Sequence, residues 1–482
     1  MFGDAAAYTV VRAVNGLLGL ATVAILTRLL EPAQYGRYAL GMAAVGMLAG
    51  VLFQWLNAAV ARLYAAHAGA PDAFLTVAHA LFGRVAAVGL AGGIAWVLLA
   101  PRPQMFDGMV GIIVVGSVGL GLHNLQLHVA NAQRLPLRYG MISAARALAF
   151  LALAVIAIGA GFGANGVLAG FASACFLALL FGTRWRWTTT PDSADLRRRL
   201  VAYGGPMAMA AAATAVLDVS DRFFIGWWHG SAAVAGYAAA YDFTQQTVGV
   251  LLHVFLMAGF PRVMAAWESA GAAGARRAME PLAHGLLVSA PFAVAVFIGM
   301  APEISRVMFG TGVRAEAALV MPWIAFAIAV GCFKAYFLDI PLQLRHATGT
   351  LMRISMAMVA VNLVLNLALV PRFGSQGAAW AAAVAFLAGA ALSWWRGRAL
   401  QVCPSLAGNA VKALGVMLAA VMAFRWSASA VEGPLSAQLF LSLATQGLSG
   451  TAAFFGTAWL IDLCGLRSVL LARAGPGSER AL

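Results

Sequence analysis

Charged residues are scarce in this chain. Asp, Glu, Lys and Arg make up 10% of its 482 residues, whereas apolar residues make up 62%. Soluble domains carry about 25% charged residues, so the composition excludes an ordinary soluble protein. Acidic residues are the rarest, 17 against 31 basic ones, which leaves a net charge of +14. The chain is instead dominated by long apolar runs, and about 20 such residues suffice to cross a bilayer as a helix.

Cysteine is also rare, and its spacing excludes the usual metal and disulfide frameworks. The four cysteines are Cys175, Cys332, Cys403 and Cys464. We expect them to be small packing residues. His123 and His128 are five residues apart and do not share a helical face, so they do not form a metal pair. The sequence therefore predicts no metal ion and no cofactor.

The apolar runs between polar breaks predict an all-α membrane protein with about fourteen transmembrane helices. The predicted spans are residues 8–30, 38–61, 78–100, 109–130, 140–160, 164–183, 203–227, 232–260, 283–301, 319–340, 352–370, 375–395, 409–427 and 437–462. The loops on the side predicted to face outward are short, which disfavours a membrane enzyme with catalytic groups in an outer domain. We therefore predict that the chain is not an enzyme.

The distribution of basic residues predicts the orientation of these spans. With a cytoplasmic N-terminus, inner segments collect twenty-one of the 31 basic residues and outer segments seven, with three left inside spans. Both termini are then cytoplasmic, and the positive charge is an orientation signal rather than a nucleic-acid footprint. The run Arg197-Arg198-Arg199 can also contact anionic headgroups. We expect no cleavable signal, because no Lys or Arg precedes Arg12 and the first apolar stretch is long enough to span a membrane.

A short sequence repeat divides the chain into two halves. Phe162-Gly163-x-x-Gly166 recurs as Phe373-Gly374-x-x-Gly377, although glycine is abundant enough for such a match to arise by chance. Six predicted spans separate the copies, so the halves point the same way and a site is expected between them. The predicted organisation is an N-terminal lobe (1–183), a basic cytoplasmic linker (184–202), a C-terminal lobe (203–396) and two further spans with a tail (397–482).

Polar side chains interrupt two neighbouring spans, which are joined by the turn Trp228-His229-Gly230-Ser231. At helical spacing they form one face on each span, and the members are Thr214, Asp218, Asp221 and Arg222, then Asp242, Gln245, Gln246, Gly249 and His253. A charge facing lipid costs at least about 2.5 kcal/mol. These two faces are therefore predicted to line a polar cavity inside a transporter.

Three further residues are candidates for the same cavity. Arg12 and Asn15 share a face of the first span, although Arg12 can instead snorkel to the inner surface and Asn15 can bond a neighbouring helix. Lys334 lies deep in the tenth span, and Asp339, five residues later, is not expected on its face. Arg146, near the start of the fifth span, is either an anchor or a charge at the inner mouth.

Several of these motifs resemble one membrane-protein family. Its hallmarks are Asp221-Arg222-Phe223-Phe224-Ile225-Gly226, then Asn362-Leu363-Val364-Leu365-Asn366 with Pro371-Arg372-Phe373-Gly374, and Arg28-Leu29-Leu30 with Tyr35-Gly36. In these the chain resembles the polysaccharide-transporter flippases, which move O-antigen or exopolysaccharide repeat units. Their superfamily also holds multidrug extruders of the MATE type and lipid II flippases. The resemblance covers essentially the whole chain.

The resemblance implies a V-shaped bundle of two six-helix lobes, with spans 1, 2, 7 and 8 around a central cavity. It also implies transfer of an undecaprenyl-diphosphate-linked oligosaccharide from the cytoplasmic to the periplasmic leaflet of the bacterial inner membrane by alternating access. Expected partners are the lipid-linked substrate, membrane lipids, a polysaccharide polymerase and chain-length proteins, but no nucleic acid. One departure is that Asp218, Asp221 and Asp242 outnumber Arg222 in spans 7 and 8.

Each candidate side chain has an expected role in this hypothesis. Basic groups would bind the diphosphate (Arg12, Arg222, Lys334) and amides the sugars (Asn15, Gln245, Gln246). The three aspartates would hold Arg222 in place or bind a proton or cation that drives rocking of the two halves. Alternatively, Asp221 and Arg222 form a structural pair. A cation-coupled extruder of amphipathic drugs and a lipid II flippase remain alternative functions.

Overall fold

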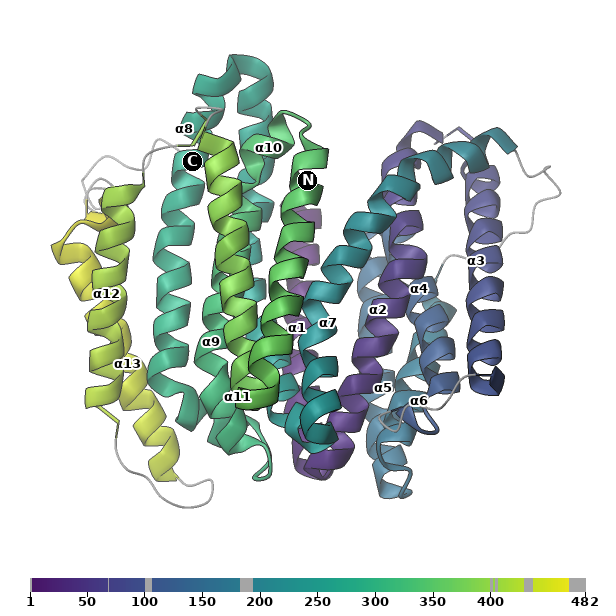
Figure 1. Cartoon of the computed structure of the whole chain (residues 1–482). Coiled ribbons are helices and arrows are strands. Elements are labelled where there is room, and N and C mark those ends of the chain that lie inside the picture. Colours follow the sequence, from purple (N-terminus) through teal and green to yellow (C-terminus); the bar gives the residue numbers. More distant parts are fainter. Residues whose placement is uncertain are drawn as a thin grey trace. The chain divides into compact units, whose positions relative to one another are not determined.

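The computed structural model of the chain is entirely helical in the part that it describes (Figure 1). The described residues are 2–67, 69–99, 106–182, 194–398, 402–403, 406–428 and 437–467. They divide into two compact units, Met1–Ala238 with Asn366–Ala378, and Ala239–Leu365 with Ala379–Leu482. We call these unit 1 and unit 2. The lobes and linker predicted from the repeat stay a prediction, and most of the predicted linker lies outside the described residues.

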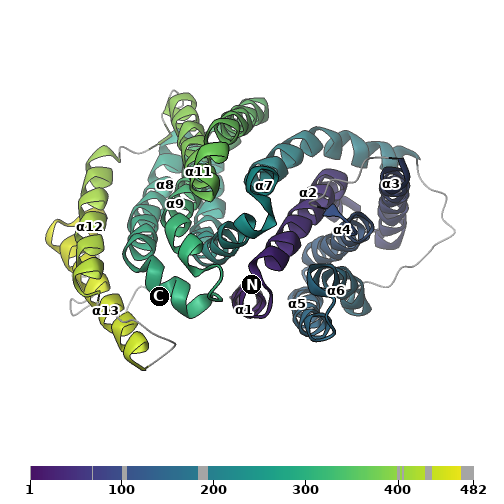
Figure 2. The same cartoon turned by 60° about the horizontal axis from the view of Figure 1, so that its bottom comes forward.

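Unit 1 is a bundle of membrane-length helices. It contains α1 (Phe2–Leu29), α2 (Pro32–Leu63), η1 (Ala65–His67), α3 (Pro71–Leu99), α4 (Val110–Ala132), α5 (Pro136–Gly159), α6 (Gly163–Leu177), η3 (Ala178–Phe181), most of α7 (Ala194–Thr244) and the middle of α11 (Thr348–Arg398). Helix α4 packs against α2 and α6, and α5 packs against α6 and α1 (Figure 2). Stacked rings of Phe53 and Phe82 belong to the apolar core between α2, α3 and α4.

Unit 2 holds the remaining helices. They are the end of α7, the π turn η4 (Gln245–Gly249), α8 (Val250–Met308), α9 (Arg314–Phe333), the π turn η5 (Lys334–Leu338), α10 (Ile340–Leu344), both ends of α11, α12 (Ala407–Trp426), α13 (Ala437–Leu460) and η6 (Leu463–Gly465). Helix α8 packs against α9 and α12, and α12 packs against α13. Phe424 and Phe454 are fully buried in the core that joins α12 and α13 to α8.

Three glycines break the longest helices. Gly230 in α7, Gly271 in α8 and Gly374 in α11 have φ values of 77°, 60° and 55°. Residues with a Cβ rarely adopt this left-handed region, so glycine permits the chain to reverse there. The turn predicted at Trp228–Ser231 is confirmed by the break at Gly230, and the break predicted between residues 370 and 375 is confirmed at Gly374.

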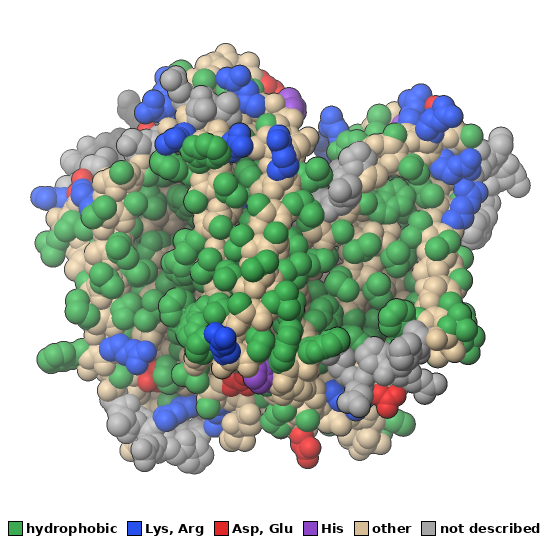
Figure 3. Space-filling model, in the orientation of Figure 1, with side chains coloured by type: hydrophobic (Ala, Val, Ile, Leu, Met, Phe, Trp, Pro, Cys, Tyr) green, Lys and Arg blue, Asp and Glu red, His purple; other side chains and the backbone are tan. Residues whose placement is uncertain are grey.

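The surface of both units fits a membrane. Large apolar side chains are exposed along the helices, and Leu99, Trp227 and Trp426 reach 84%, 76% and 93% exposure. In the space-filling view, hydrophobic side chains cover the middle of the helices while Lys and Arg gather near their ends (Figure 3). Among the described residues, nine helices are long and apolar enough to cross a bilayer, with residues 215–308 of α7 and α8 counted as one and α11 counted as one. The chain is therefore a multi-pass helical protein, and the count of fourteen spans stays a prediction.

Gly36 lies inside a helix, although the sequence placed it between the predicted spans 8–30 and 38–61. Helix α2 begins at Pro32, and Gly36 is a buried residue within it. A Cβ added to Gly36 would collide with the backbone carbonyl of Ser231, next to the break at Gly230. The glycine therefore serves close packing of two backbones in unit 1 rather than a turn.

Candidate functional site

Asp221 is the centre of a buried polar cluster in unit 1. Its side chain is 3% exposed, and its two carboxylate oxygens each accept a hydrogen bond. The Tyr237 hydroxyl donates to Oδ2 at 2.6 Å, and the Asn366 amide donates to Oδ1 at 2.6 Å. A buried carboxylate needs such donors because its desolvation is expensive. Asp221 thereby joins two segments of α7, before and after Gly230, to the middle of α11.

The other candidates of unit 1 have varied surroundings. Arg222 is buried beside Asp221, and Asp218, one turn earlier and exposed, is close enough to interact with both charges. The Asn15 amide donates to the Val11 carbonyl at 2.9 Å, and its oxygen accepts no hydrogen bond within the described part of the chain. The side chains of Arg12 and Thr214 lie outside the described residues.

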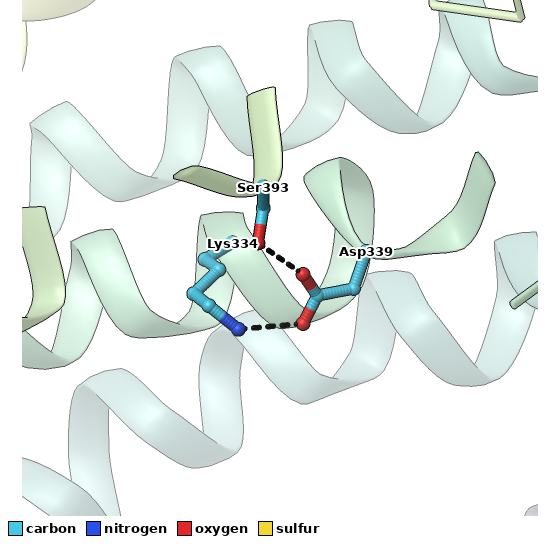
Figure 4. A network of polar contacts seen from close by, with 3 residues as sticks. All are labelled: Lys334, Asp339 and Ser393. Atoms are coloured by element: carbon cyan, nitrogen blue, oxygen red, sulfur yellow. Dashed lines mark hydrogen bonds and ion pairs between the residues drawn. The ribbon is translucent and has the colours of Figure 1, made fainter. Parts of the chain in front are cut away.

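A second buried polar cluster lies in unit 2, where Lys334 forms an ion pair with Asp339 (Figure 4). Lys334 Nζ lies 2.8 Å from Asp339 Oδ2, and both side chains are about nine-tenths buried, at 9% and 10% exposure. The Ser393 hydroxyl, from the C-terminal part of α11, donates to Asp339 Oδ1 at 2.6 Å. The pair neutralises two charges that would otherwise be costly inside a membrane.

The expectation that Lys334 and Asp339 lie on different faces is wrong. That expectation assumed 3.6 residues per turn, whereas residues Lys334–Leu338 form a π turn. The Asp339 N–H donates to the Lys334 carbonyl at 2.9 Å, which is the i→i+5 bond of a π-helix. One extra residue per turn brings position i+5 back over position i. The two side chains therefore meet on one face.

A second π turn, Gln245–Gly249, begins the neighbouring helix of unit 2. One turn beyond it, His253 Nδ1 lies 3.2 Å from the Tyr336 hydroxyl, within the first π turn, and the two rings meet edge to face. Gln245 is exposed, whereas Gln246, Asp242 and His253 are half-buried. Both π turns thus lie on packed elements of one unit, and such turns are frequent at functional sites.

Arg146 and His123 form a polar contact within unit 1 that the sequence did not predict. Arg146 Nε donates to His123 Nε2 at 3.1 Å, and the guanidinium lies 5.6 Å from the centre of the Phe171 ring. His123 is 1% exposed. Arg146 is ten residues into α5, about 15 Å from Pro136 at the helical rise. It is therefore a charge within the span rather than at its mouth, and only the observed start of α5 reveals this.

The predicted cavity residues fall into two groups. Asn15, Asp218, Asp221 and Arg222 belong to unit 1, and Asp242, Gln245, Gln246, His253 and Lys334 belong to unit 2. A common cavity for the two groups stays a prediction. Tyr237, Asn366, Tyr336 and Ser393 were not predicted as site residues, because nothing in their local sequence indicates which carboxylate or ring they contact. Among the described residues, no three His, Cys, Asp or Glu side chains form a group that could hold a metal ion.

Long apolar helices with buried ionic and amide groups are typical of membrane proteins that contain a substrate or ion pathway. The chain belongs to the polysaccharide biosynthesis protein family, whose sequence model matches residues 25–312. The resemblance seen at Asp221–Gly226 and in the other motifs is thereby confirmed at the level of this family. No curated protein matches the chain in sequence.

Solved structures show the same fold as this chain. The lipid II flippase MurJ in an inward closed conformation is similar with a TM-score of 0.74 at 11% identity, over 96% of this chain and 99% of MurJ. An inward-facing multidrug resistance MATE family transporter of the MOP superfamily is similar with a TM-score of 0.63 at 13% identity, over 82% and 99%. These likenesses confirm the predicted fold class. Both relatives are named for transport, and the prediction that the chain is not an enzyme is confirmed at this level.

Proposed function

We propose that the protein is a flippase that moves an undecaprenyl-diphosphate-linked oligosaccharide repeat unit from the cytoplasmic to the periplasmic leaflet. The observation that carries this proposal is the burial of charged and amide side chains within membrane-length helices of a polysaccharide biosynthesis family member. Such groups are expensive in lipid and are retained where a polar cargo passes. The product would supply O-antigen or exopolysaccharide synthesis at the inner membrane.

The cargo explains why the helices need these groups. A sugar diphosphate must cross about 30 Å of hydrocarbon, and bare charges there cost several kcal/mol or more each. Arg12 and Arg222 would bind the diphosphate, while Asn15, Gln245 and Gln246 would hydrogen-bond the sugars. Lys334 would join them only after exchanging Asp339 for phosphate oxygens, because the two are paired in this structure. The lipid tail can remain in the bilayer throughout.

The remaining parts of the proposal concern movement and partners. The two lobes, 1–183 and 203–396, would rock in alternating access, with both termini in the cytoplasm. Asp218, Asp221 and Asp242 would hold Arg222 or carry a coupling proton or cation. Asp221 is well placed to transmit movement, since its oxygens tie α7 to α11. A polymerase and chain-length proteins would then receive the exported repeat units.

The test is complementation of a strain that lacks this protein. Arg222→Gln removes the buried charge, and Arg353→Gln removes an exposed charge near the start of α11 as a matched control. The lipid-linked oligosaccharide should accumulate on the cytoplasmic side with Arg222→Gln but not with the control. Normal export by Arg222→Gln at an equal protein level would refute its role with the diphosphate. Unchanged surface glycan in the deletion strain would refute the flippase itself.

A lipid II flippase is the second candidate, because the MurJ likeness extends over 96% of the chain. A multidrug extruder is the third, since the MATE likeness covers 82%. Vesicles containing the purified protein can separate the three. Flipping of lipid II in preference to the oligosaccharide lipid would select the second function. Drug accumulation in the vesicles, with neither lipid flipped, would select the third.

A further inference from the structure

Three arginines at one end of unit 2 are each stacked on a tryptophan. The guanidinium carbon of Arg396 lies 4.6 Å from the centre of the Trp395 ring, and that of Arg398 lies 5.2 Å from Trp394. Arg345, directly after α10, lies 5.4 Å from the Trp267 ring of α8. We call these six residues the Trp–Arg end. Cation–π attraction holds a guanidinium over the ring and leaves N–H groups available to donate.

The charges of the Trp–Arg end are uncompensated within the described part of the chain. All three arginines are exposed, and none of them forms an ion pair with a described carboxylate. Trp394 and Trp395 are 53% and 49% exposed. Three planar cations with free N–H edges match the geometry of phosphate oxygens, which arginine can bind with two parallel hydrogen bonds.

The position along the helices places these residues at a bilayer surface. Residues 314–344 and 348–398 are membrane-length, and Arg345, Arg396 and Arg398 lie at or just beyond their ends. Exposed Trp is favoured at headgroup depth, with its ring in the apolar zone and its N–H towards water. Lys and Arg side chains gather at this end of α11 in the space-filling view (Figure 3).

The Trp–Arg end also touches the buried ion pair of unit 2. A Cβ on Gly397 would lie 3.5 Å from the Leu338 carbonyl and 3.9 Å from Pro341 Cβ, so this part of α11 packs directly on the π turn and α10. One turn earlier on α11, Ser393 donates to Asp339. A ligand that holds Arg396 and Arg398 would therefore steady the segment that completes the Lys334–Asp339 pair.

We propose that the Trp–Arg end binds the phosphate headgroup of an anionic phospholipid of the surrounding membrane. The guanidinium groups donate to the phosphate oxygens, and the acyl chains lie along the apolar surface of α11. Bound lipid stabilises the packing of α11 on α10. This site is distinct from the proposed cargo cavity and does not depend on the identity of the cargo.

A general attraction of positive charge to the membrane would not require these particular residues. Arg276 and Arg277, just after the break at Gly271 in the same unit, are exposed and not stacked on any described ring. The double variant Arg276→Gln/Arg277→Gln removes the same charge as Arg396→Gln/Arg398→Gln. It is therefore the matched control for a surface-charge effect.

The experiment uses the full-length protein in nanodiscs of phosphatidylcholine with or without phosphatidylglycerol, and no cargo is added. Native mass spectrometry counts the lipids that each protein retains. The unfolding temperature of each protein is measured in both kinds of nanodisc. The wild type should retain phosphatidylglycerol in preference to phosphatidylcholine and unfold at a higher temperature with it. Each arginine lost should weaken the preference for phosphatidylglycerol about fivefold. The double variant Arg396→Gln/Arg398→Gln should therefore weaken it about twenty-five-fold. The control should remain near wild type.

Three outcomes would overturn the proposal. One is a wild type that shows no preference for phosphatidylglycerol, which needs no variant to measure. The second is an equal loss in the Arg276/Arg277 control, which would assign the effect to diffuse charge. The third is full retention by Arg396→Gln/Arg398→Gln. Arg396→Lys/Arg398→Lys keeps the charge but not the planar fork, and a partial loss there supports a bound phosphate rather than a diffuse layer.

Discussion

Lys334 and Asp339 are five residues apart, and their side chains pair at 2.8 Å because the backbone between them forms a π turn. A regular α-helix would place them about 140° apart around its axis. In the native sequence, the irregular turn is therefore what brings the two charges together. Neither side chain has another charged partner of opposite sign among the described residues.

Removing one charge of this pair should destabilise the protein far more than removing both charges. Asp339→Asn leaves the Lys334 charge buried without its counter-ion and is expected to cost about 3–5 kcal/mol of unfolding free energy. The double variant Lys334→Met/Asp339→Asn buries no charge and should regain most of this loss. Thermal unfolding of the purified variants in one detergent measures both. Equal losses in the single and double variants would show that the charges do not interact.

Deleting one residue from the π turn should be tolerated. Without Ala335 the turn can close as a regular α-helix, and Lys334 and Asp339, then four apart, still share a face. We expect a loss of about 1 kcal/mol, from the hydrogen bond between His253 and Tyr336. Deletion of Ala329 in α9 is the control, because it rotates the packed residues between it and the π turn by about 100°. Yield and unfolding temperature compare the two, and equally severe deletions would contradict the extra-residue account.

Gly36→Ala and Gly46→Ala should have opposite effects, although both glycines lie in α2. A methyl group on Gly36 would collide with the Ser231 carbonyl, whereas none of the described atoms lies within 4 Å of a Cβ at Gly46. Alanine in an open helical position stabilises by about 1 kcal/mol relative to glycine. Gly46→Ala should therefore raise the unfolding temperature and Gly36→Ala should lower it. A neutral Gly36→Ala would mean that the two backbones are not in contact.

Arg146 should stabilise unit 1 through His123. Arg146→Leu leaves His123 Nε2 buried without its donor, at an expected cost of about 1–3 kcal/mol. The double variant His123→Phe/Arg146→Leu replaces both partners and should recover much of that loss. Arg138→Leu, near the start of the same helix, is the control. A double-mutant cycle from thermal unfolding gives the coupling free energy between Arg146 and His123. A value near zero would mean that the 3.1 Å contact does not stabilise the protein.

Much of the fold was predictable because the bilayer leaves few choices. Apolar runs of membrane length must be helical, since lipid offers no partner for free backbone groups. The breaks at Gly230 and Gly374 were also predictable, because both glycines interrupt apolar runs next to polar residues. The helix start at Pro136 was not located well enough, and Arg146 was therefore expected as an anchor or at the inner mouth instead of deep within a span.

The candidate site was predictable only as a set of residues. Helical spacing selected Asp221 and depth within a span selected Lys334, because ionisable groups inside apolar runs stand out. It did not select their partners, since Tyr237 and Ser393 are ordinary residues until another helix packs on them. The Lys334–Asp339 contact was missed for another reason, because a π turn has no reliable signal in local sequence.

By itself, the sequence determined that the chain crosses a membrane as helices and that a few polar side chains lie within them. Both properties follow from the free-energy cost of exposing polar groups to lipid. That cost depends on the composition of each segment by itself and not on the other segments. Only the tertiary structure decided which groups meet. Asp221 and Asn366 are 145 positions apart and come within 2.6 Å because α7 and α11 pack together. A hydrogen bond requires two atoms at a given distance and angle, and no single segment specifies both.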